Sequence, residues 1–390
     1  MKSISVMGLV MVGLMCGQGS SRVVQPSSID TVDGSLVNTE LVVVFVVFRH
    51  GDRTPDDEEL DLYPSDQKLS DKIFFPYGKK ALTNKGKQRS CHVGKYLREL
   101  YDGFISRLYL PDEIIVRTTD FARTKMTALT ALACMYPPVM AQKWNPALDW
   151  QPIPYDTLPY EEDDLLYWYN CPRYLWLRDQ MYDRPEIKKW LDPYQNLFKY
   201  LTVKTGHNIT KAEDVFYLDN LFQTLKNVQV DPPKWAQEVM PQIKELTKIE
   251  YAIESYTSEL IKLASGQLME FILNTTMSAI HNTSYPMEPK MHLFSAHENN
   301  VATAMAAARV FQPHQPNYGA TFSLELRRNL LSGDYGMVAI YARDAGGPGE
   351  ILPINGCGGE IFCRYETFVN LVKENALSAE AMKRQCSILV

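Results

Sequence analysis

Residues suited to phosphate chemistry occur in three short segments that lie far apart in the chain. They are Arg49, His50 and Arg53 in the segment RHGDRTP, Arg117 after the apolar segment EIIV, and the adjacent pair His297 and Glu298. Planar guanidinium groups donate paired hydrogen bonds to phosphate oxygens and stabilise the charge that develops during phosphoryl transfer. Because like charges repel, several arginines in one cleft need an anionic ligand. The residue types therefore predict a phosphate-binding site.

The reaction predicted at such a site is hydrolysis in two steps. The cations beside His50 favour its neutral form, so a ring nitrogen stays available as a nucleophile at mildly acidic pH. Gly51 is expected to let the backbone turn tightly beside the phosphate. His297 can donate a further hydrogen bond to the phosphoryl group, and protonated Glu298 can give its proton to the leaving alcohol oxygen. This scheme passes through a phosphohistidine and uses neither a metal nor another cofactor.

Three strand-then-helix units are predicted to position these residues. Strands are expected at Leu41–Phe48, at Glu113–Val116 and from Met291 to about Ser295. Helices are expected to follow them at 82–101 with Thr83 as the N-cap, at 120–136 and at 301–311. Each unit places its polar residues where ligands bind in open α/β sheets, beyond the carboxyl end of the strand. The later segments ATFSLELRR and YGMVAIYAR alternate as a hairpin or edge strands do.

Strands that alternate with helices predict an α/β fold around a central sheet. The stretch 151–287 differs, because it is rich in Trp, Tyr and Lys and has helical periodicity over 234–272. We interpret this stretch as a mainly helical insertion, the predicted cap, whose aromatic residues mostly form its core. The predicted α/β core then covers about 38–150 and 288–375 of a domain that spans 38–390.

Composition limits the function classes. The chain has 390 residues and a formal net charge of -6, without the basic excess typical of nucleic-acid binders. Residues 1–20 place a lysine ahead of an apolar stretch that is too short to span a membrane, as in a secretory signal peptide. No later segment has the roughly 20 apolar residues that a span requires. We expect a secreted protein, with the lysosomal lumen as the alternative, and glycosylation sequons at Asn208, Asn274 and Asn282 agree with export.

Cysteine usage also agrees with export. Cys16 would leave with the signal peptide, and six cysteines remain: Cys91, Cys134, Cys171, Cys357, Cys363 and Cys386. An even number in an exported chain favours disulfides. Zinc at Cys357 and Cys363 is the competing interpretation, but neither a second close pair nor a Cys/His partner completes a tetrahedral set.

Taken together, the motifs resemble those of the histidine acid phosphatases. RHGDRTP is similar to the RHGxRxP signature of that family, and FSAHENN is similar to its later His-Asp element, with Glu in place of Asp. The likeness extends through VRTTDFARTKMTA, LDWQPIPYDTLPYEEDDLLY, NCPRY and INGCGGEIFC, and the forms RHGDRTP and AHE look most like the insect and venom-type members. The resemblance implies a central mixed sheet with helices on both faces, a helical cap, and acid phosphatase activity on small phosphate monoesters.

The same resemblance assigns roles to individual residues. His50 matches the family's nucleophile, and Glu298 falls on the proton-donor position, where the mammalian prostatic and lysosomal relatives carry Asp. The residues that match phosphate-binding positions are Arg49, Arg53, Arg117 and His297. Disulfides Cys171–Cys386 and Cys357–Cys363 are also implied, which leaves Cys91 and Cys134, on the helices after the first two strands, as the third pair.

Plainer interpretations remain beside these assignments. Arg49 and Arg53 can form structural ion pairs with the acidic run 56–59, and for Arg123 a structural salt bridge is the favoured role. Asp52 and Asp120 are expected to orient arginines or to cap helices. Five further histidines are expected at the surface or in packing: His92, His207, His281, His292 and His314.

Two other functions and the formation of a homodimer stay open. The first alternative is a phosphatase for inositol polyphosphates, which favour a basic mouth, whereas the loop after RHGDRTP is acidic. The second is a secreted binding or allergen-like protein with little turnover, because Glu298 replaces Asp. A homodimer also stays open.

Overall fold

A computed structural model of the chain describes residues 36–66, 69, 71–281 and 289–387. The predicted signal peptide, with Cys16, and the sequon at Asn282 lie outside the described residues. Eight strands of the described chain form one sheet. Their bounds are β1 Thr39–Arg49, β2 Ile114–Thr118, β3 Asp156–Thr157, β4 Met291–Ala296, β5 Thr321–Asn329, β6 Tyr335–Ala342, β7 Glu350–Leu352 and β8 Cys363–Arg364.

The sheet is mixed, as the resemblance implied. The strand order is β3-β2-β4-β1-β5-β6-β7, and β8 pairs with β6. The strands from β3 to β1 in this order run parallel, whereas β5, β6 and β7 continue the sheet antiparallel. In the register, Arg49 lies opposite Ala296 and Thr118 lies opposite Ser295. The carboxyl ends of β1, β2 and β4 therefore reach the same edge of the sheet.

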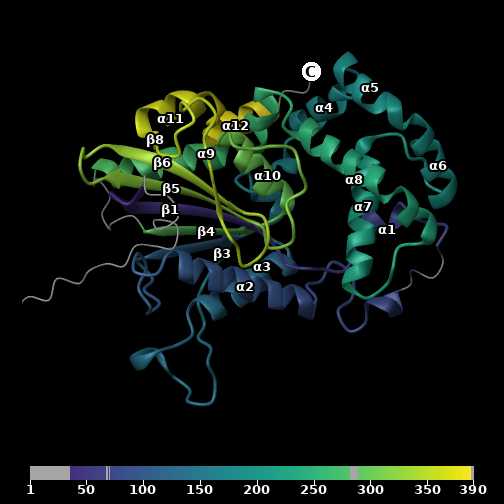
Figure 1. The fold of residues 1–390 in the computed structure, drawn as a ribbon. Coiled ribbons are helices and arrows are strands. Elements are labelled where there is room, and N and C mark those ends of the chain that lie inside the picture. The colour runs from purple at the N-terminus through teal and green to yellow at the C-terminus, as the bar shows by residue number, and fades with distance from the viewer. Residues whose placement is uncertain (1–35, 67–68, 70, 282–288, 388–390) are drawn as a thin grey trace, which may run out of the picture.

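Helices cover both faces of the sheet (Figure 1). One face carries α2 (Asn84–Leu100) and α3 (Ala122–Met135), and the other carries α9 (Ser258–His281), α10 (Glu298–Ala307) and α11 (Tyr365–Val372). Side chains alternate along β1, so Val44 and Val46 pack with α2 and α3, while Val43 and Phe45 pack with α9 and α10. A strand that is covered on both faces must be apolar throughout, which explains the continuous apolar run before Arg49.

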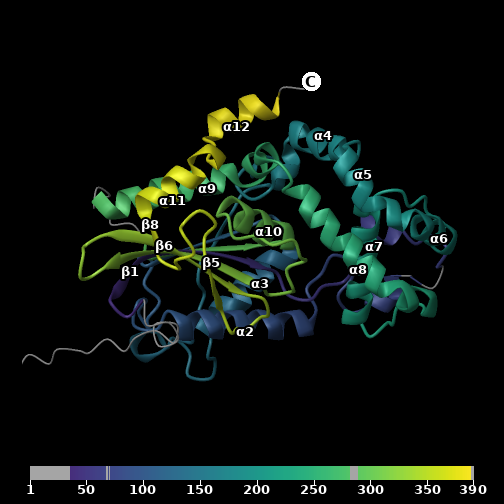
Figure 2. The same cartoon turned by 45° about the horizontal axis from the view of Figure 1, so that its top comes forward.

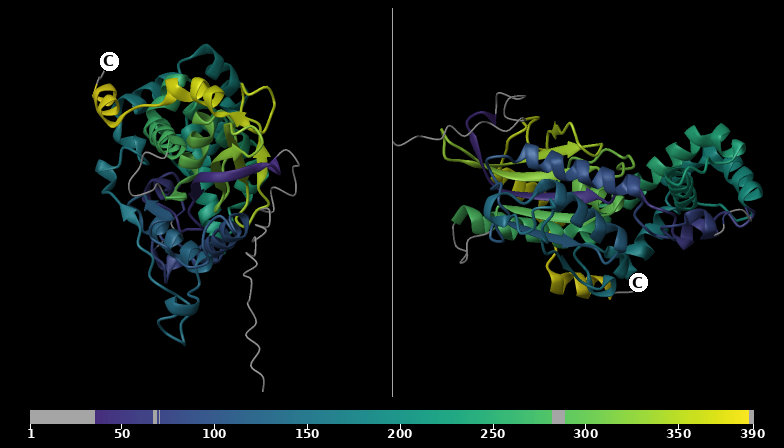
Figure 3. Two further views of the ribbon diagram at one scale, coloured as in Figure 1. Left: turned by 90° about the vertical axis from the view of Figure 1, so that its left-hand side faces the viewer. Right: turned by 90° about the horizontal axis from the view of Figure 1, so that it is seen from below.

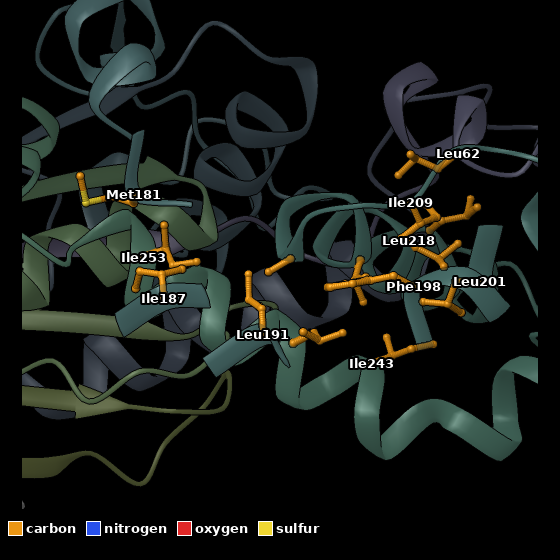
Figure 4. Close-up of a cluster of buried hydrophobic side chains, with 14 of the residues drawn as sticks. Leu62, Met181, Ile187, Leu191, Phe198, Leu201, Ile209, Leu218, Ile243 and Ile253 are labelled. Atoms are coloured by element: carbon orange, nitrogen blue, oxygen red, sulfur yellow. The ribbon is translucent and has the colours of Figure 1, made fainter. Parts of the chain in front are cut away.

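A second group of helices forms a lobe beside the sheet (Figures 2 and 3). This helical lobe consists of α1 (Asp57–Asp61), α4 (Pro172–Met181), α5 (Pro185–Leu191), α6 (Gln195–Thr205), α7 (Ala212–Asn227) and α8 (Lys234–Glu254). Short 3₁₀ helices lie at Asp71–Phe74, Met140–Gln142, Tyr160–Glu162, Trp168–Asn170, Asp192–Tyr194 and Lys373–Asn375. The lobe has its own apolar core, to which Ile187, Phe198, Leu218 and Ile243 contribute (Figure 4). Leu62, in the segment after β1, joins this core.

The structure corrects three details of the sequence interpretation. α9 falls within the predicted cap, 151–287, yet it packs Leu268, Met269 and Ile272 against strand residues of the sheet. Conversely α1, which was assigned to the core range, packs against α7 in the helical lobe. β5 and β6 form the expected hairpin, but they are interior strands, since β1 and β7 pair with their outer sides. The division into domains as a whole stays a prediction.

Three disulfides connect residues that lie 43, 215 and 6 positions apart in the sequence. Cys91–Cys134 joins α2 to α3, Cys171–Cys386 joins the residue before α4 to α12 (Ala379–Cys386), and Cys357–Cys363 closes a short loop before β8. These are the pairs that the sequence analysis expected. A cross-link over 215 residues restricts the unfolded chain strongly, so Cys171–Cys386 is expected to stabilise the fold by a few kcal/mol, about 2–4.

Among the described helices, none is both long enough and apolar enough to cross a lipid bilayer.

Candidate active site

The candidate site lies at the shared carboxyl edge of β1, β2 and β4. His50 follows β1, and its backbone N–H donates to the carbonyl of Ala296 at 3.0 Å. Thr119 follows β2 and donates in the same way to the carbonyl of Ser295 at 3.3 Å. His297 follows β4 and is the N-cap of α10. Backbone hydrogen bonds therefore hold the residues that directly follow β1, β2 and β4 side by side.

The ring of His50 presents one nitrogen to this site. Its Nδ1 lies 2.8 Å from the carbonyl oxygen of Gly51. A carbonyl oxygen only accepts hydrogen bonds, so Nδ1 must carry the proton and Nε2 must carry the lone pair. Nε2 is buried and has no hydrogen-bond partner among the described residues, and it lies 4.0 Å from Oε2 of Glu298. The ring is therefore oriented as a nucleophile.

The surroundings of His50 keep this lone pair free of a proton. Burial lowers the pKa of His50 well below its usual value, and the positive charges of Arg123, Arg49 and Arg53 lower it further. Burial is also the largest cause that lowers the pKa of His297. Both rings are therefore neutral at mildly acidic pH, as the sequence analysis expected for His50.

Arg49 is held rigidly below the nucleophile. It donates from one terminal nitrogen to the carbonyl of Pro316 at 2.7 Å, and its Nε lies 3.0 Å from Oε2 of Glu298. The centre of its guanidinium group lies 3.9 Å over the ring of Tyr318. The second terminal nitrogen is buried and has no partner among the described residues. These three contacts fix the orientation of the Arg49 guanidinium, and its second terminal nitrogen is left free to donate to a ligand.

Arg53 and Arg123 are joined through carboxylates. Arg53 binds Glu59 through both terminal nitrogens, at 2.8 and 2.6 Å. Asp56 lies 3.7 Å from Arg53 and 3.3 Å from Arg123, between the two guanidinium groups. The Nε atoms of both arginines are buried and have no partner in the described chain. The ion pairs that the plainer interpretation expected for Arg53 and Arg123 therefore exist, and they hold the two groups beside the site.

His297 and Glu298 complete the site from the start of α10. Nε2 of His297 lies 3.0 Å from Oγ1 of Thr119, and its ring centre is 5.4 Å from that of His50. Glu298 is the first residue of α10, and only 5% of its surface is exposed. Its carboxylate faces both Arg49 and His50. A carboxylic acid at this position can reach a group bound to His50.

These residues border a cavity of about 220 Å³ between the sheet edge and the helical lobe. Arg53, Arg123, His297 and Glu298 lie on its lining, with His50 directly behind them. Six aromatic residues also line it: Phe121, Tyr167, Trp168, Tyr169, Phe216 and Tyr217. We call this space the catalytic cavity. Its size suits a small organic molecule, and its cationic floor suits an anionic group.

A protein-family comparison gives the identity of the fold. The model described as the histidine phosphatase superfamily (branch 2) matches residues 40–329. This chain belongs to that superfamily. The family expected from RHGDRTP and FSAHENN is therefore confirmed.

Curated relatives of this histidine phosphatase are acid phosphatases. The venom acid phosphatase of Apis mellifera is 31% identical over 348 residues, which cover 89% of this chain and 88% of that protein. The prostatic acid phosphatase of Homo sapiens is 32% identical over 354 residues, which cover 87% of each chain. The lysosomal acid phosphatase of Xenopus laevis is 29% identical over 89% of this chain and 79% of its own. The assignment as an acid phosphatase is confirmed at this level.

Solved structures confirm the fold class. The phytase of Citrobacter braakii superposes with a TM-score of 0.64 over 90% of this chain and 100% of its own, at 15% identity. A phytase of Hafnia alvei superposes with a TM-score of 0.65 over 90% and 99% of the two chains, at 14% identity. At such low identity these likenesses concern the fold alone.

In this histidine phosphatase, one residue that was predicted to bind phosphate, Arg117, lies outside the site. Arg117 does not reach the catalytic cavity, because it donates to Asp163 at 2.6 Å and borders a different cavity, beside Asp156 and Glu162. The reason is the alternation of side chains along β2, which turns Val116 toward α2 and α3 and Arg117 toward the opposite face.

Arg123 takes the place that was predicted for Arg117. It lies in the first turn of α3, the helix that follows β2, and that end of the helix faces the edge of the sheet. Its charge is the largest electrostatic contribution that lowers the pKa values of both His50 and His297, after burial. The sequence signal was its position in FARTKMTA, after the strand-to-helix loop rather than within the strand.

Gly51 serves helix packing rather than a turn beside the ligand. A Cβ atom at Gly51 would lie 2.2 Å from the carbonyl oxygen of Gly86 in α2, and a Cβ at Gly86 would lie 2.1 Å from the carbonyl oxygen of Asp52. The backbone after His50 therefore touches the backbone of α2 directly. Asp52 binds Arg89 and Lys85 of α2 instead of an arginine of the site, so it joins the segment after His50 to α2 and does not orient the phosphate-binding arginines as expected.

The site favours an anion over a metal ion. Ligand-type atoms of His50, His297 and Glu298 lie within 4.8 Å of one another, which would suit a cation by distance alone. The positive charges of Arg49 and Arg123 both act on His50, however, and Glu298 is paired with Arg49. Phosphate oxygens, rather than a divalent cation, complement this arrangement.

Proposed function

We propose that this acid phosphatase hydrolyses phosphate monoesters through a phosphohistidine on Nε2 of His50. The observation that carries the proposal is the unpartnered Nε2, which lies 4.0 Å from Glu298 on the lining of the catalytic cavity and belongs to a cluster in which Arg49, Arg53 and Arg123 also keep unpartnered nitrogens. In the first step Nε2 forms a bond to phosphorus, and the bond from phosphorus to the ester oxygen breaks. In the second step water attacks phosphorus, and the histidine is released with inorganic phosphate.

Glu298 is the proposed proton carrier. Its acid form gives a proton to the leaving alcohol oxygen in the first step, and its carboxylate takes a proton from the attacking water in the second. Both roles need a carboxyl group beside His50, and the 4.0 Å between Oε2 and Nε2 supports them. Glu298 reaches this point from the first residue of α10.

The arginines and His297 are proposed to bind the phosphoryl group. Donors that are already oriented stabilise developing charge without reorganising during the reaction. Arg49 is fixed by Pro316 and Tyr318, and Arg123 is fixed by Asp56. Arg117 is not part of this set.

A rapid-quench experiment tests the mechanism. Wild type and His50→Ala are mixed with a labelled monoester and denatured within one turnover. The wild type is expected to retain an acid-labile phosphoryl label, and His50→Ala is expected to retain none. Turnover by the wild type without a covalent label would refute the phosphohistidine, and neither turnover nor label would favour the binding or allergen-like protein.

Hydrolysis of inositol polyphosphates is the second candidate activity, and the fold shared with phytases is the reason to consider it. The lining of the catalytic cavity carries Asp56, Glu58, Glu59 and Lys80. Asp56 and Glu59 are paired with the arginines of the floor, so Glu58 is the exposed carboxylate on the lining that opposes a ligand with many phosphates. We therefore expect hydrolysis of p-nitrophenyl phosphate to exceed that of phytate, and the ratio of their kcat/KM values is the measurement.

The proposal also covers where the protein is exported to and whether it forms a homodimer. We place the mature protein in a secretory compartment, either extracellular or lysosomal, with residues 1–20 removed. Asn208 and Asn274 are exposed and accessible to glycosylation in the structure. Glycosidase sensitivity of the exported protein tests the compartment, and sedimentation at several concentrations tests the homodimer.

A further inference from the structure

The outer part of the catalytic cavity contains groups that the phosphatase mechanism does not use. An aromatic wall leads outward from the reaction centre: the ring of Phe121 lies 5.0 Å from that of His297 and 5.9 Å from that of Tyr167, which lies 5.7 Å from Tyr169. Phe216 and Tyr217 of α7 also line the cavity. A leaving group attached to a bound phosphoryl group would contact these aromatic side chains.

One carboxylate at this mouth lies outside the ion pairs of the described residues. Glu58 borders the cavity from α1, is exposed, and has no described cation within ion-pair distance. Its neighbour Asp57 is paired with Lys79 and Lys80, each at 3.0 Å. Lys80, the lysine on the lining, thus binds Asp57, which raises its pKa, and the charge of Glu58 raises the pKa of Lys80 further without a direct contact.

Glu58 acts on the aromatic wall electrostatically. Burial raises the pKa of Tyr167, and the negative charge of Glu58 raises it further. One ring of this wall already binds a cation, because the guanidinium of Arg123 lies 4.6 Å over the ring of Phe121. No described cation lies over Tyr167, Tyr169 or Tyr217. Aromatic faces beside an unpaired carboxylate are the chemistry that binds ammonium groups.

We infer that the outer cavity is a subsite for an ammonium group on the leaving alcohol, which makes phosphate monoesters of amino alcohols its preferred substrates. This inference rests on the proposed phosphatase function and names its substrate class. The arginines of the floor bind the phosphoryl end, while Tyr167 and Glu58 bind the cationic end. The alcohol that leaves with the proton from Glu298 is then an amino alcohol, and the other product is inorganic phosphate.

A pair of isosteric substrates isolates the charge. Phosphocholine carries a trimethylammonium group, and 3,3-dimethylbutyl phosphate carries a neutral tert-butyl group of the same shape. We expect kcat/KM to be roughly tenfold higher for phosphocholine, from one cation–aromatic contact and one partly screened ion pair. The preference should shrink as the salt concentration rises. A wild-type ratio near one would overturn the inference.

Three variants assign the preference to residues. Glu58→Gln and Tyr167→Leu are each expected to lower the phosphocholine preference severalfold, whereas Tyr167→Phe, which keeps the aromatic face, should retain it. Glu245→Gln, which changes an exposed carboxylate of α8, is the matched control and should leave the ratio unchanged. If Glu58→Gln keeps the full preference, the carboxylate is not part of the subsite.

Two controls separate this inference from the proposed function. Hydrolysis of p-nitrophenyl phosphate with a substrate ratio near one would refute the ammonium subsite alone. If no ester is hydrolysed, the phosphatase function fails, and calorimetric binding of the two probes to wild type and Glu58→Gln still compares the cation with its neutral isostere. Equal affinity for both probes would then refute the subsite as well.

Discussion

Two buried arginine clusters in this protein differ in how completely they are satisfied. In the helical lobe, Arg178 binds Glu250 through two nitrogens and Glu213 through the third. At the edge of the sheet, Arg49, Arg53 and Arg123 each keep a buried nitrogen that has no partner among the described residues. An unpaired buried donor costs free energy, so it persists where a ligand completes it. Arg117 also keeps an unpaired Nε, but it lies outside the catalytic cavity, so the binding cluster is distinguished from the structural cluster by unpaired donors that gather beside that cavity.

Removing the structural arginine should give the largest loss of stability. Arg178→Ala leaves the buried carboxylate of Glu250 without its cation, which is expected to cost about 3–5 kcal/mol of unfolding free energy. Urea unfolding measures this cost. Activity per folded molecule should stay close to that of the wild type. A large loss of kcat with normal stability would show that the two clusters are not separate in function.

Removing a binding arginine should have the reverse effect. Arg123→Ala takes a donor from the phosphoryl group, and kcat/KM is expected to fall by roughly 10²–10³-fold. Arg117→Ala is the matched control, because Arg117 lies on a neighbouring segment but outside the catalytic cavity, and it should change kcat/KM by less than about threefold. Steady-state rates with p-nitrophenyl phosphate compare them. Equal losses in both variants would reject the geometric distinction.

The proton carrier of the binding cluster is tested by the leaving group. Glu298→Gln keeps the shape and removes the proton, so it should slow alkyl phosphates by roughly 10²-fold more than p-nitrophenyl phosphate, whose leaving group needs little protonation. The ratio of kcat/KM for the two substrates in wild type and variant is the readout. A uniform loss would assign Glu298 to positioning Arg49 instead.

The last prediction concerns pH and the structural cluster. Burial raises the pKa of Glu254 to about 8, against a reference near 4.5, although Arg178 opposes the shift. A raised carboxyl pKa means that its contribution to stability is complete below about pH 4.5 and is lost as the pH rises to about 8. Glu254→Gln does not titrate, so its unfolding free energy should fall less steeply between pH 5 and 8, by at most about 1.4 kcal/mol per pH unit. Parallel curves for wild type and variant would show that Glu254 is ionised throughout.

The sequence was sufficient for the parts of the site that follow directly from strand ends. Arg49 and His50 end an apolar run, and His297 and Glu298 end another, so their meeting at one sheet edge follows from parallel pairing. Arg117 and Arg123 were different, because both lie near the end of β2. The choice between them depends on which face of the sheet a strand residue points to and where a helix begins, and both are set by tertiary packing.

The fold showed the same limit. The buried strands and the helices after them were predictable from their apolar patterns and from Thr83, which accepts a hydrogen bond from Gly86 as an N-cap. The place of α9 was not, because an apolar helix face packs equally well on a sheet or on other helices. Long-range contacts decided that α9 covers β1 and that α1 joins the lobe.

The position of the phosphoryl label tests the central claim most directly. Wild-type protein is quenched in alkali during turnover of a labelled monoester, digested, and examined by mass spectrometry and phosphorus NMR. The hydrogen bond from Nδ1 to Gly51 predicts that the label lies on Nε2 of His50. A label on Nδ1, or on any residue other than His50, would contradict the account.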